Sequence, residues 1–442
     1  MRAHHLSNAA FGVLDYAAYP VGMLLVAPIM LRNLGVAQYG VWAVATAAVN
    51  TGSIIASGFG DANIQHVATE RTTGDSNALV RTVRNTMGIH LLLGAVMAII
   101  LWIAAPYLAG RVAGTSADLE ASCLWCLRIA GLITFVRTVE SVCVSTQRAF
   151  ERYGAAVRIS VAARLLSLAA AALLALSSHG VVSILAITAV VTGIGLLLQL
   201  GRLKSLLHAT TLSPGFDPQT TKALFRFGIF SWLLAVSGVL FSQADRLIGG
   251  AALGAAAVAS YALCAQLAQP IYGFTASGLH FLFPYLSGQR VSATAATLRK
   301  AVLLALVANV VFVLSSTLGL LLIGNRILLA WGGEAIASSG TSLLPIVAWS
   351  SALLGLNVTG SYAMMALGRV QTLTWINVAA GAAMLLLVSV LLPRRGMSGI
   401  AEARLFHGFI TLLIYAPLVV ALRKGAVSHR QTSIGLPASE EA

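Results

Sequence analysis

Twelve apolar stretches, each long enough to cross a lipid bilayer, recur along this chain and constrain its fold more than any other feature. A hydrocarbon core about 30 Å thick needs about 20 helical residues. Only 10% of the residues are charged, against about a quarter in soluble domains. We therefore predict an all-α polytopic membrane protein of about twelve transmembrane helices, with spans at residues 8–32, 39–60, 85–107, 117–145, 156–178, 181–201, 225–247, 255–287, 298–323, 338–366, 371–392 and 399–422.

The distribution of basic residues predicts the orientation of these spans. With one span, kinked at Pro270, between residues 247 and 289, the segments on one side of the membrane hold 18 Lys and Arg and those on the other side hold six. Because basic residues collect in cytoplasmic loops, we expect both termini to be cytoplasmic. The net charge of +14 needs no nucleic acid as a partner, since no basic run reaches five consecutive charges.

The two halves of the chain resemble each other. Leu34–Gly35 and Leu253–Gly254 each follow an odd-numbered span and are 219 positions apart. Since each half holds an even number of spans, the second copy starts on the same side of the membrane as the first, and the repeats are parallel. We predict two six-helix lobes at 1–201 and 225–424, a cytoplasmic linker at 202–224 and a polar cytoplasmic tail at 425–442.

Charged residues inside the spans are the candidate site. Arg137 and Arg164 lie at similar distances from the turn at 147–155, so both are expected about halfway across the membrane. A charge there costs about 2.5–3.5 kcal/mol. Glu140, one turn from Arg137, can neutralise one of the two arginines. The other arginine then favours an anion, although an Arg137–Glu140 ion pair of purely structural importance remains an alternative.

Three segments are similar to a known family of transporters. They are PIMLRNLGVAQYGVW at 28–42, QADRLIGGAALG at 243–254 followed by VASY at 258–261, and ALGR at 366–369. These segments resemble the polysaccharide transporter family of the multidrug/oligosaccharidyl-lipid/polysaccharide (MOP) exporter superfamily, and with twelve spans in two lobes the likeness covers almost the whole chain. The motifs identify the superfamily better than they identify the substrate.

The resemblance implies a flippase that moves undecaprenyl-pyrophosphate-linked oligosaccharide across the bacterial cytoplasmic (inner) membrane by alternating access, for O-antigen or exopolysaccharide biosynthesis. Its expected partners are this substrate, membrane lipids and a polysaccharide polymerase or export machinery. Arg137 and Arg164 become the first candidates to bind the pyrophosphate, because arginine forms a permanently charged, planar fork. Arg128 and Arg404, nearer the opposite side, are expected to receive the anion later. A structural alternative for Arg404 is an ion pair with Glu402 near a helix end.

The resemblance also bears on ion coupling. Asp15 lies five residues before Pro20 in the first span, and acidic residues near a first-span proline couple cations in the drug-exporting branch of the superfamily. Asp15 is therefore a candidate proton or sodium site. A salt bridge from Asp15 to Arg137 or Arg164 is the structural alternative.

Two other functions remain open. A cation-coupled multidrug or metabolite antiporter has the same architecture, and Asp15 exposed in a cavity with few arginines favours it. A membrane polysaccharide polymerase or glycosyltransferase normally has a large extracytoplasmic loop or an acidic metal-binding motif, and the sequence has neither. We therefore expect a protein that is not an enzyme. The CxxC of Cys123 and Cys126 has no second pair or histidine cluster, so no metal or other cofactor is assigned.

Overall fold

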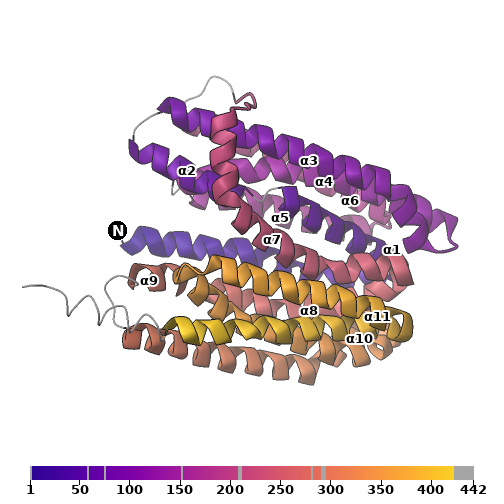
Figure 1. Cartoon of the computed structure of the whole chain (residues 1–442). Coiled ribbons are helices and arrows are strands. Elements are labelled where there is room, and N and C mark those ends of the chain that lie inside the picture. Colours follow the sequence, from indigo (N-terminus) through magenta and orange to yellow (C-terminus); the bar gives the residue numbers. More distant parts are fainter. Residues whose placement is uncertain are drawn as a thin grey trace, which may run out of the picture.

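The computed structural model describes residues 2–56, 59–73, 76–150, 153–207, 212–279, 282–289 and 295–422. The secondary structure within these ranges is helical, without strands. Long helices run side by side, with the N-terminus at one end of the bundle (Figure 1). Seven helices in the described ranges are long and apolar enough to cross a membrane. The prediction of an all-α, multi-pass membrane protein is confirmed.

The helices follow the predicted spans closely. The first half of the chain forms α1 (Arg2–Ala56), α2 (Gly60–Thr73), α3 (Ser76–Ala113), α4 (Ala117–Ala149), α5 (Tyr153–Leu176) and α6 (Val181–Leu207). The second half forms α7 (Pro218–Leu253), α8 (Ala255–Gly278), α9 (Leu282–Gln289), α10 (Ala295–Ala366), α11 (Val370–Thr411) and a short 3-10 turn, η1 (Leu412–Ile414), after which the helix continues to residue 422.

Three of these helices each contain two predicted spans. In α1, α10 and α11 the spans meet at a single residue with positive φ: Gly35 (φ 81°), Gly333 (φ 72°) and Gly396 (φ 57°). Loops of several residues were expected there. A hydropathy window does not register a reversal made by one residue, whereas glycine adopts positive φ at little cost. The helix α8 continues through Pro270 and ends at Gly278, and the kink at Pro270 stays a prediction.

The backbone supports the internal repeat. Gly254 has φ 84° and ψ 172°, close to the φ 81° and ψ 165° of Gly35. Further positive-φ residues recur at nearly the same separation, so the turns that close successive odd and even spans have a positive φ at matching positions in both halves. The pairs are Gly35 and Gly254 (219 apart), Gly114 and Gly333 (219 apart), and Ser178 and Gly396 (218 apart).

We call the end of the bundle that carries these turns the distal end, and the end that carries the N-terminus the proximal end. The two halves touch at the distal end. A Cβ built on Gly40 of α1 would lie 1.9 Å from the carbonyl oxygen of Ala255, the first residue of α8. Arg32 donates a hydrogen bond to the carbonyl of Ala330 in α10, and Arg111 donates one to the carbonyl of Ala251 (3.2 Å).

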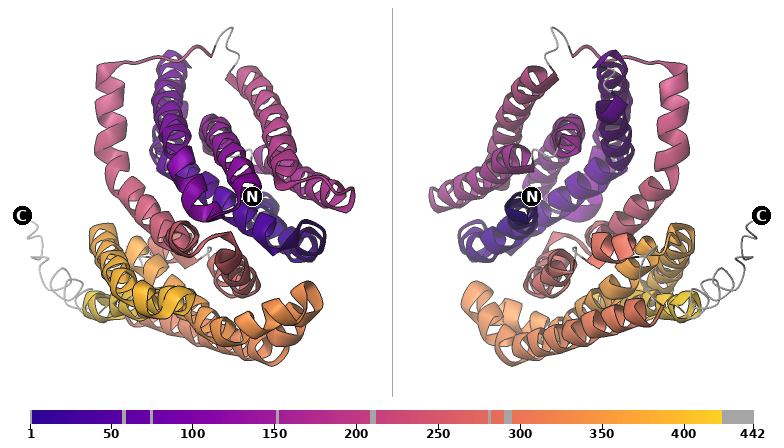
Figure 2. Two further views of the ribbon diagram at one scale, coloured as in Figure 1. Left: turned by 90° about the vertical axis from the view of Figure 1, so that its right-hand side faces the viewer. Right: turned by 90° about the vertical axis from the view of Figure 1, so that its left-hand side faces the viewer.

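At the proximal end the chain passes from one half to the other along α3. Gly215 donates a backbone hydrogen bond to Arg84 (2.9 Å), and Asn85 accepts one from the backbone N–H of Asp217 (2.7 Å). Asp217 then caps the start of α7 by accepting from the Thr220 amide (2.8 Å). From this point α7 crosses from the first half toward the second, as the end-on views show (Figure 2).

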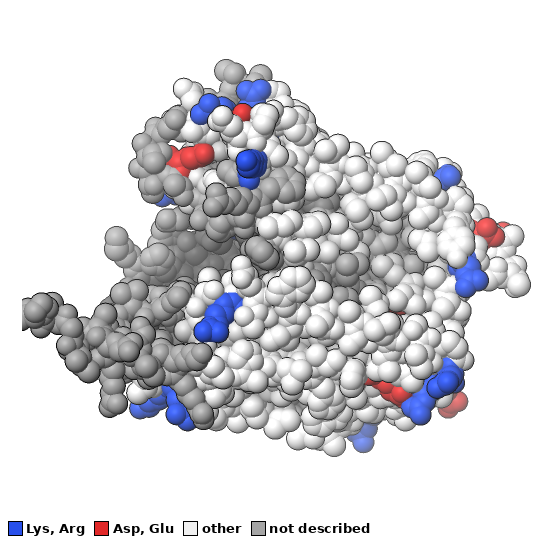
Figure 3. Space-filling model, in the orientation of Figure 1, with Lys and Arg blue, Asp and Glu red and all other residues white. Residues whose placement is uncertain are grey.

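The surface has the polarity of a membrane protein. On the face shown in Figure 3, charged side chains gather toward the two ends of the helices and the middle is nearly free of them. Large apolar side chains point outward over the middle of several helices, including Ile103, Leu197, Leu322 and Leu386. In a soluble protein such a surface would cause aggregation. In a bilayer it contacts lipid chains.

Candidate functional site

Two adjoining cavities lie inside the first half of the chain and share Arg137, Arg164 and Ser167. The first is otherwise lined by Trp42, Thr46, Val49, Ile133, Leu168, Ala171, Leu185 and Thr188. The second is otherwise lined by Glu140, Ser141, Val144, Arg148, Val157, Ser160, Ala163 and Thr192. The first cavity is mainly apolar, whereas most of the residues that line the second are polar or charged. The two shared arginines therefore lie where a polar space meets an apolar one.

Helical spacing brings these side chains together. In α4, Arg137, Ser141, Val144 and Arg148 follow one another at intervals of four, three and four residues, which places them on one face. In α5 the same geometry aligns Ser160, Arg164 and Ser167. Each stripe interrupts an otherwise apolar helix, and the two stripes face the same cavity. This periodicity was present in the sequence and is the signal that connects the arginines to the surrounding hydroxyl groups.

The structure brings the two predicted arginines to one site. Arg137 is 20 residues from the start of α4, and Arg164 is 11 residues from the start of α5. Each therefore lies more than about 15 Å from either end of its helix. Arg137 Nη1 also lies 3.5 Å from Asn50 Oδ1 of α1. The shared position is established by the cavity lining, whereas anion binding by these residues stays a prediction.

Glu140 belongs to a chain of hydrogen bonds rather than to an ion pair with Arg137. Ser160 Oγ donates to Glu140 Oε1 (2.9 Å), Gln199 Nε2 donates to Ser160 Oγ (3.3 Å), and Gln147 Nε2 donates to Gln199 Oε1 (2.6 Å). Every donor in this chain points toward the carboxylate. The chain of hydrogen bonds ties α4, α5 and α6 together beside the cavity, and through Ser160 it supplies the Glu140 carboxylate with a donor.

Arg148 was missed as a cavity residue. Arg148 lies outside the predicted span at 117–145, within the predicted turn at 147–155. In the structure α4 continues to Ala149, and Arg148 lines the polar cavity three turns from Arg137. Among the described residues, three arginines and one glutamate line this space. The net charge of these four side chains is positive, which suits an anionic ligand.

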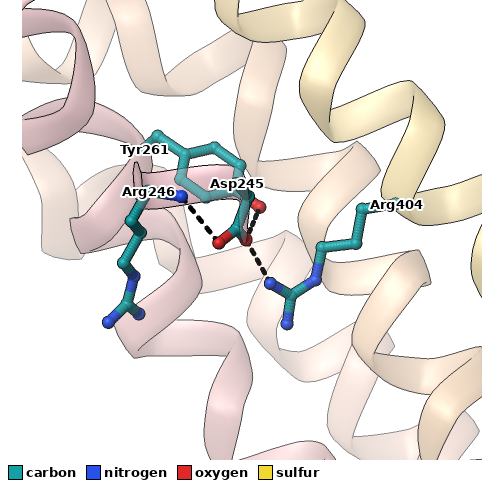
Figure 4. A network of polar contacts seen from close by, with 4 residues as sticks. All are labelled: Asp245, Arg246, Tyr261 and Arg404. Atoms are coloured by element: carbon teal, nitrogen blue, oxygen red, sulfur yellow. Dashed lines mark hydrogen bonds and ion pairs between the residues drawn. The ribbon is translucent and has the colours of Figure 1, made fainter. Parts of the chain in front are cut away.

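Arg404 has a different environment. Its Nη1 forms an ion pair with Asp245 Oδ2, which also accepts a hydrogen bond from the Tyr261 hydroxyl (Figure 4). Asp245 Oδ1 accepts from the backbone N–H of Arg246 (2.8 Å). The network joins α7, α8 and α11, and Asp245 and Tyr261 are buried. Asp245 lies two residues before the end of the predicted span at 225–247, and its ion pair with Arg404 was not expected.

The expected Glu402–Arg404 pair is wrong. Glu402 instead pairs with Arg395 (2.8 Å), seven residues earlier and across the turn at Gly396. The reversal at Gly396 brings these two side chains together at the exposed distal end, whereas Arg404 points into the second half. Glu402 is thus a charge-pairing residue, as predicted, but with another partner.

Arg128 lies outside both cavities. Its guanidinium carbon is 4.8 Å from the ring centre of Trp102 in α3 and 5.4 Å from that of Trp125 in α4. Both tryptophans are half-exposed on the outer surface. Neither Arg128 nor Arg404 is therefore among the described residues that surround Arg137 and Arg164. The side chain of Asp15, the candidate coupling residue, lies outside the described residues.

Solved structures with a similar fold are transporters. The lipid II flippase MurJ in an inward closed conformation matches with a TM-score of 0.71 and 12% identity, over 99% of this chain and 93% of that one. A multidrug resistance MATE family transporter of the MOP superfamily, in an inward-facing conformation, matches with a TM-score of 0.67 and 14% identity, over 96% of both chains. The MATE multidrug transporter DinF-BH gives 0.65 and 16%, also over 96% of both.

At these identities the solved structures establish the fold alone. No curated protein sequence matches the chain. A model of the family described as "Polysaccharide biosynthesis protein" matches residues 10–289, more than half of the chain and including all the residues that line the two cavities. The chain belongs to this polysaccharide biosynthesis family.

Proposed function

We propose that this protein is a flippase for undecaprenyl-pyrophosphate-linked oligosaccharide. The position of Arg137 and Arg164, at the boundary between the polar and the apolar cavity, carries the proposal. A lipid-linked oligosaccharide has the same order of parts: a polar sugar, an anionic pyrophosphate and an apolar chain. The two guanidinium groups suit the pyrophosphate, because arginine makes strong, charge-assisted hydrogen bonds to phosphate oxygens.

The surrounding residues support the same arrangement. Ser141, Ser160 and Thr192 line the polar cavity and offer hydroxyl groups to a sugar. Val49, Ile133, Leu168 and Leu185 line the other cavity and suit the first isoprene units of a polyprenyl chain. Arg148 lies three turns from Arg137 toward the proximal end of α4. We place the proximal end in the cytoplasm, so that Arg148 meets the incoming pyrophosphate before Arg137 and Arg164 do.

The proposal also covers the membrane location, the partners and the transport mechanism of the protein. We place the protein in the bacterial cytoplasmic membrane with both termini inside, and we expect a polysaccharide polymerase or export machinery to receive the flipped substrate. Transport is proposed to follow alternating access between the two lobes, 1–201 and 225–424. Proton or sodium coupling at Asp15 stays a prediction.

The test is flipping of a fluorescent polyprenyl-pyrophosphate-linked oligosaccharide in proteoliposomes. A hydrogen bond to a charged group contributes about 1.5–3 kcal/mol, so Arg137→Ala and Arg164→Ala should each lower the rate at least about tenfold. The double variant should abolish flipping and, in cells, polysaccharide export, while the protein still inserts. Arg326→Ala removes an exposed arginine of α10 and serves as the matched control, with unchanged rates.

Two outcomes would overturn the proposal. Full flipping by the double alanine variant excludes the anion role of Arg137 and Arg164. Wild-type protein that transports organic cations but leaves the lipid-linked oligosaccharide in place identifies a multidrug antiporter instead. In a deletion strain, lipid-linked oligosaccharide should accumulate on the cytoplasmic face of the membrane.

A further inference from the structure

The outer surface of the first half carries one arginine among lipid-facing residues. Trp125, Arg128 and Leu132 of α4 are spaced three and four residues apart, so they share one helix face. Trp125 is 51% exposed and Leu132 54% exposed. On the neighbouring helix α3, Trp102 is 51% exposed and Ile103 is 73% exposed. Arg128 therefore lies on the surface that meets lipid.

Arg128 has aromatic neighbours but no anionic one. Its guanidinium lies over the rings of Trp102 and Trp125, at 4.8 and 5.4 Å. It forms no hydrogen bond or ion pair with the described residues, and its Nε is buried without a partner. Arg404, by comparison, has the Asp245 carboxylate as its counter-ion. Among the described residues no anion balances the charge on Arg128, which leaves its guanidinium available to an anionic group from outside the chain.

The depth of Arg128 in the membrane indicates which anionic group can reach it. Arg128 is 11 residues from Ala117, the distal start of α4, or about 16 Å along the helix axis. Asp118 and Glu120 mark the polar end of the same helix. Tryptophans are enriched at the level of the lipid headgroups, and two of them flank Arg128. Although the Cα of Arg128 lies within the hydrocarbon at this depth, its long side chain can extend from there to the headgroup phosphates of the adjacent leaflet.

We propose that Arg128, Trp102 and Trp125 form a binding site for the headgroup phosphate of an anionic phospholipid in the leaflet at the distal end. The tryptophans hold the guanidinium by cation–π contact and fix it for the phosphate. The same contacts disfavour phosphatidylcholine. Its quaternary ammonium also binds to aromatic faces, and here Arg128 already covers both rings.

Native mass spectrometry of the purified protein tests this site. Wild-type protein is mixed with equimolar phosphatidylglycerol and phosphatidylcholine of identical acyl chains, and the retained lipids are counted. Replacing Arg128 with Gln removes one charge-assisted contact, so retention of one phosphatidylglycerol should fall about tenfold. Arg326→Gln removes another exposed arginine, one that has no ring contact with the described residues, and should retain lipid like the wild type. Arg128→Lys keeps the charge and should retain lipid better than Arg128→Gln.

Four results would overturn the proposal. The first is equal phosphatidylglycerol retention by Arg128→Gln and wild type, with all variants monodisperse. The second is equal retention of phosphatidylcholine and phosphatidylglycerol by the wild type. Displacement of phosphatidylglycerol by excess inorganic phosphate would show a simple anion site. Loss of oligosaccharide flipping in Arg128→Gln without loss of phosphatidylglycerol would place Arg128 on the substrate path instead.

Discussion

The contact between Gly40 and Ala255 makes a quantitative prediction about conformational change. Gly40 follows the turn at Gly35 and Ala255 follows the turn at Gly254, so this contact closes the distal end between the two halves. A Cβ on Gly40 would lie 1.9 Å from the Ala255 oxygen and 2.5 Å from its carbonyl carbon. Real Cβ atoms essentially never approach within 3.0 Å of another heavy atom. Gly40→Ala therefore requires the two backbones to separate by more than about 1 Å.

The steric clash of Gly40→Ala raises the free energy of the state in which the distal end is closed. Overpacking of a close contact typically costs about 1–3 kcal/mol. A state in which the distal end is open does not bear this cost, because the two backbones are then apart. Gly40→Ala should consequently shift the balance toward the distally open state by about 5- to 150-fold. Flipping should slow, since alternating access needs both states.

Spin labels can measure this shift. Cysteines introduced at Thr115 and Glu334 place labels on exposed distal turns of the two halves, and the four native cysteines are buried. Double electron–electron resonance should show a longer distance for Gly40→Ala than for the wild-type background. Gly193→Ala is the control, because a Cβ there meets nothing within 4 Å. A distance distribution for Gly40→Ala that matches the control would refute this reasoning.

Three further variants test other parts of the structure by thermal unfolding in detergent. Asp245→Asn should destabilise the protein by about 3–5 kcal/mol, because it leaves Arg404 buried without its counter-ion; adding Arg404→Gln should recover part of the loss, and no recovery would contradict the pairing. Ser160→Ala breaks the chain of hydrogen bonds to Glu140 and should cost about 1 kcal/mol, whereas Ser167→Ala, which loses a bond within its own helix, should cost less. Hydrogen bonds from the Thr220 hydroxyl and amide lower the pKa of Asp217, so its contribution is complete at neutral pH and is lost as the pH falls through the lowered pKa; Asp217→Asn should flatten the acid side of the stability profile.

Hydropathy predicted the spans because a bilayer imposes a simple rule on length and polarity. The same rule explains why the turns made by a single residue were missed. A turn made by one residue, such as Gly35, leaves no polar gap for a window to detect. The repeat was visible in the sequence through Leu34–Gly35 and Leu253–Gly254, since a positive φ at that point requires glycine in both halves.

The cavity was partly predictable for a similar reason. Arg137 and Arg164 stand out because charge is rare in a span, and helical spacing sets their depth. Partners across helices are different: the pairing of Arg404 with Asp245 joins residues 159 positions apart, and nothing in the local sequence indicates it. Glu402 likewise pairs with Arg395 and not with Arg404 because the chain reverses at Gly396. The sequence predicted a longer loop at this point.

The helix α7 connects the two lobes that the proposed alternating access moves relative to each other. Fourteen residues from its start it is attached to the first half, where Trp232 Nε1 donates to the carbonyl of Ile55 (2.7 Å), and near its end Asp245 attaches it to the second half through Arg404. A rigid rod attached at both points would hold the halves at a fixed angle. Each transport cycle must therefore bend α7 or release one of its two attachments. The mechanical resistance of this one helix then sets a barrier to transport that is independent of substrate.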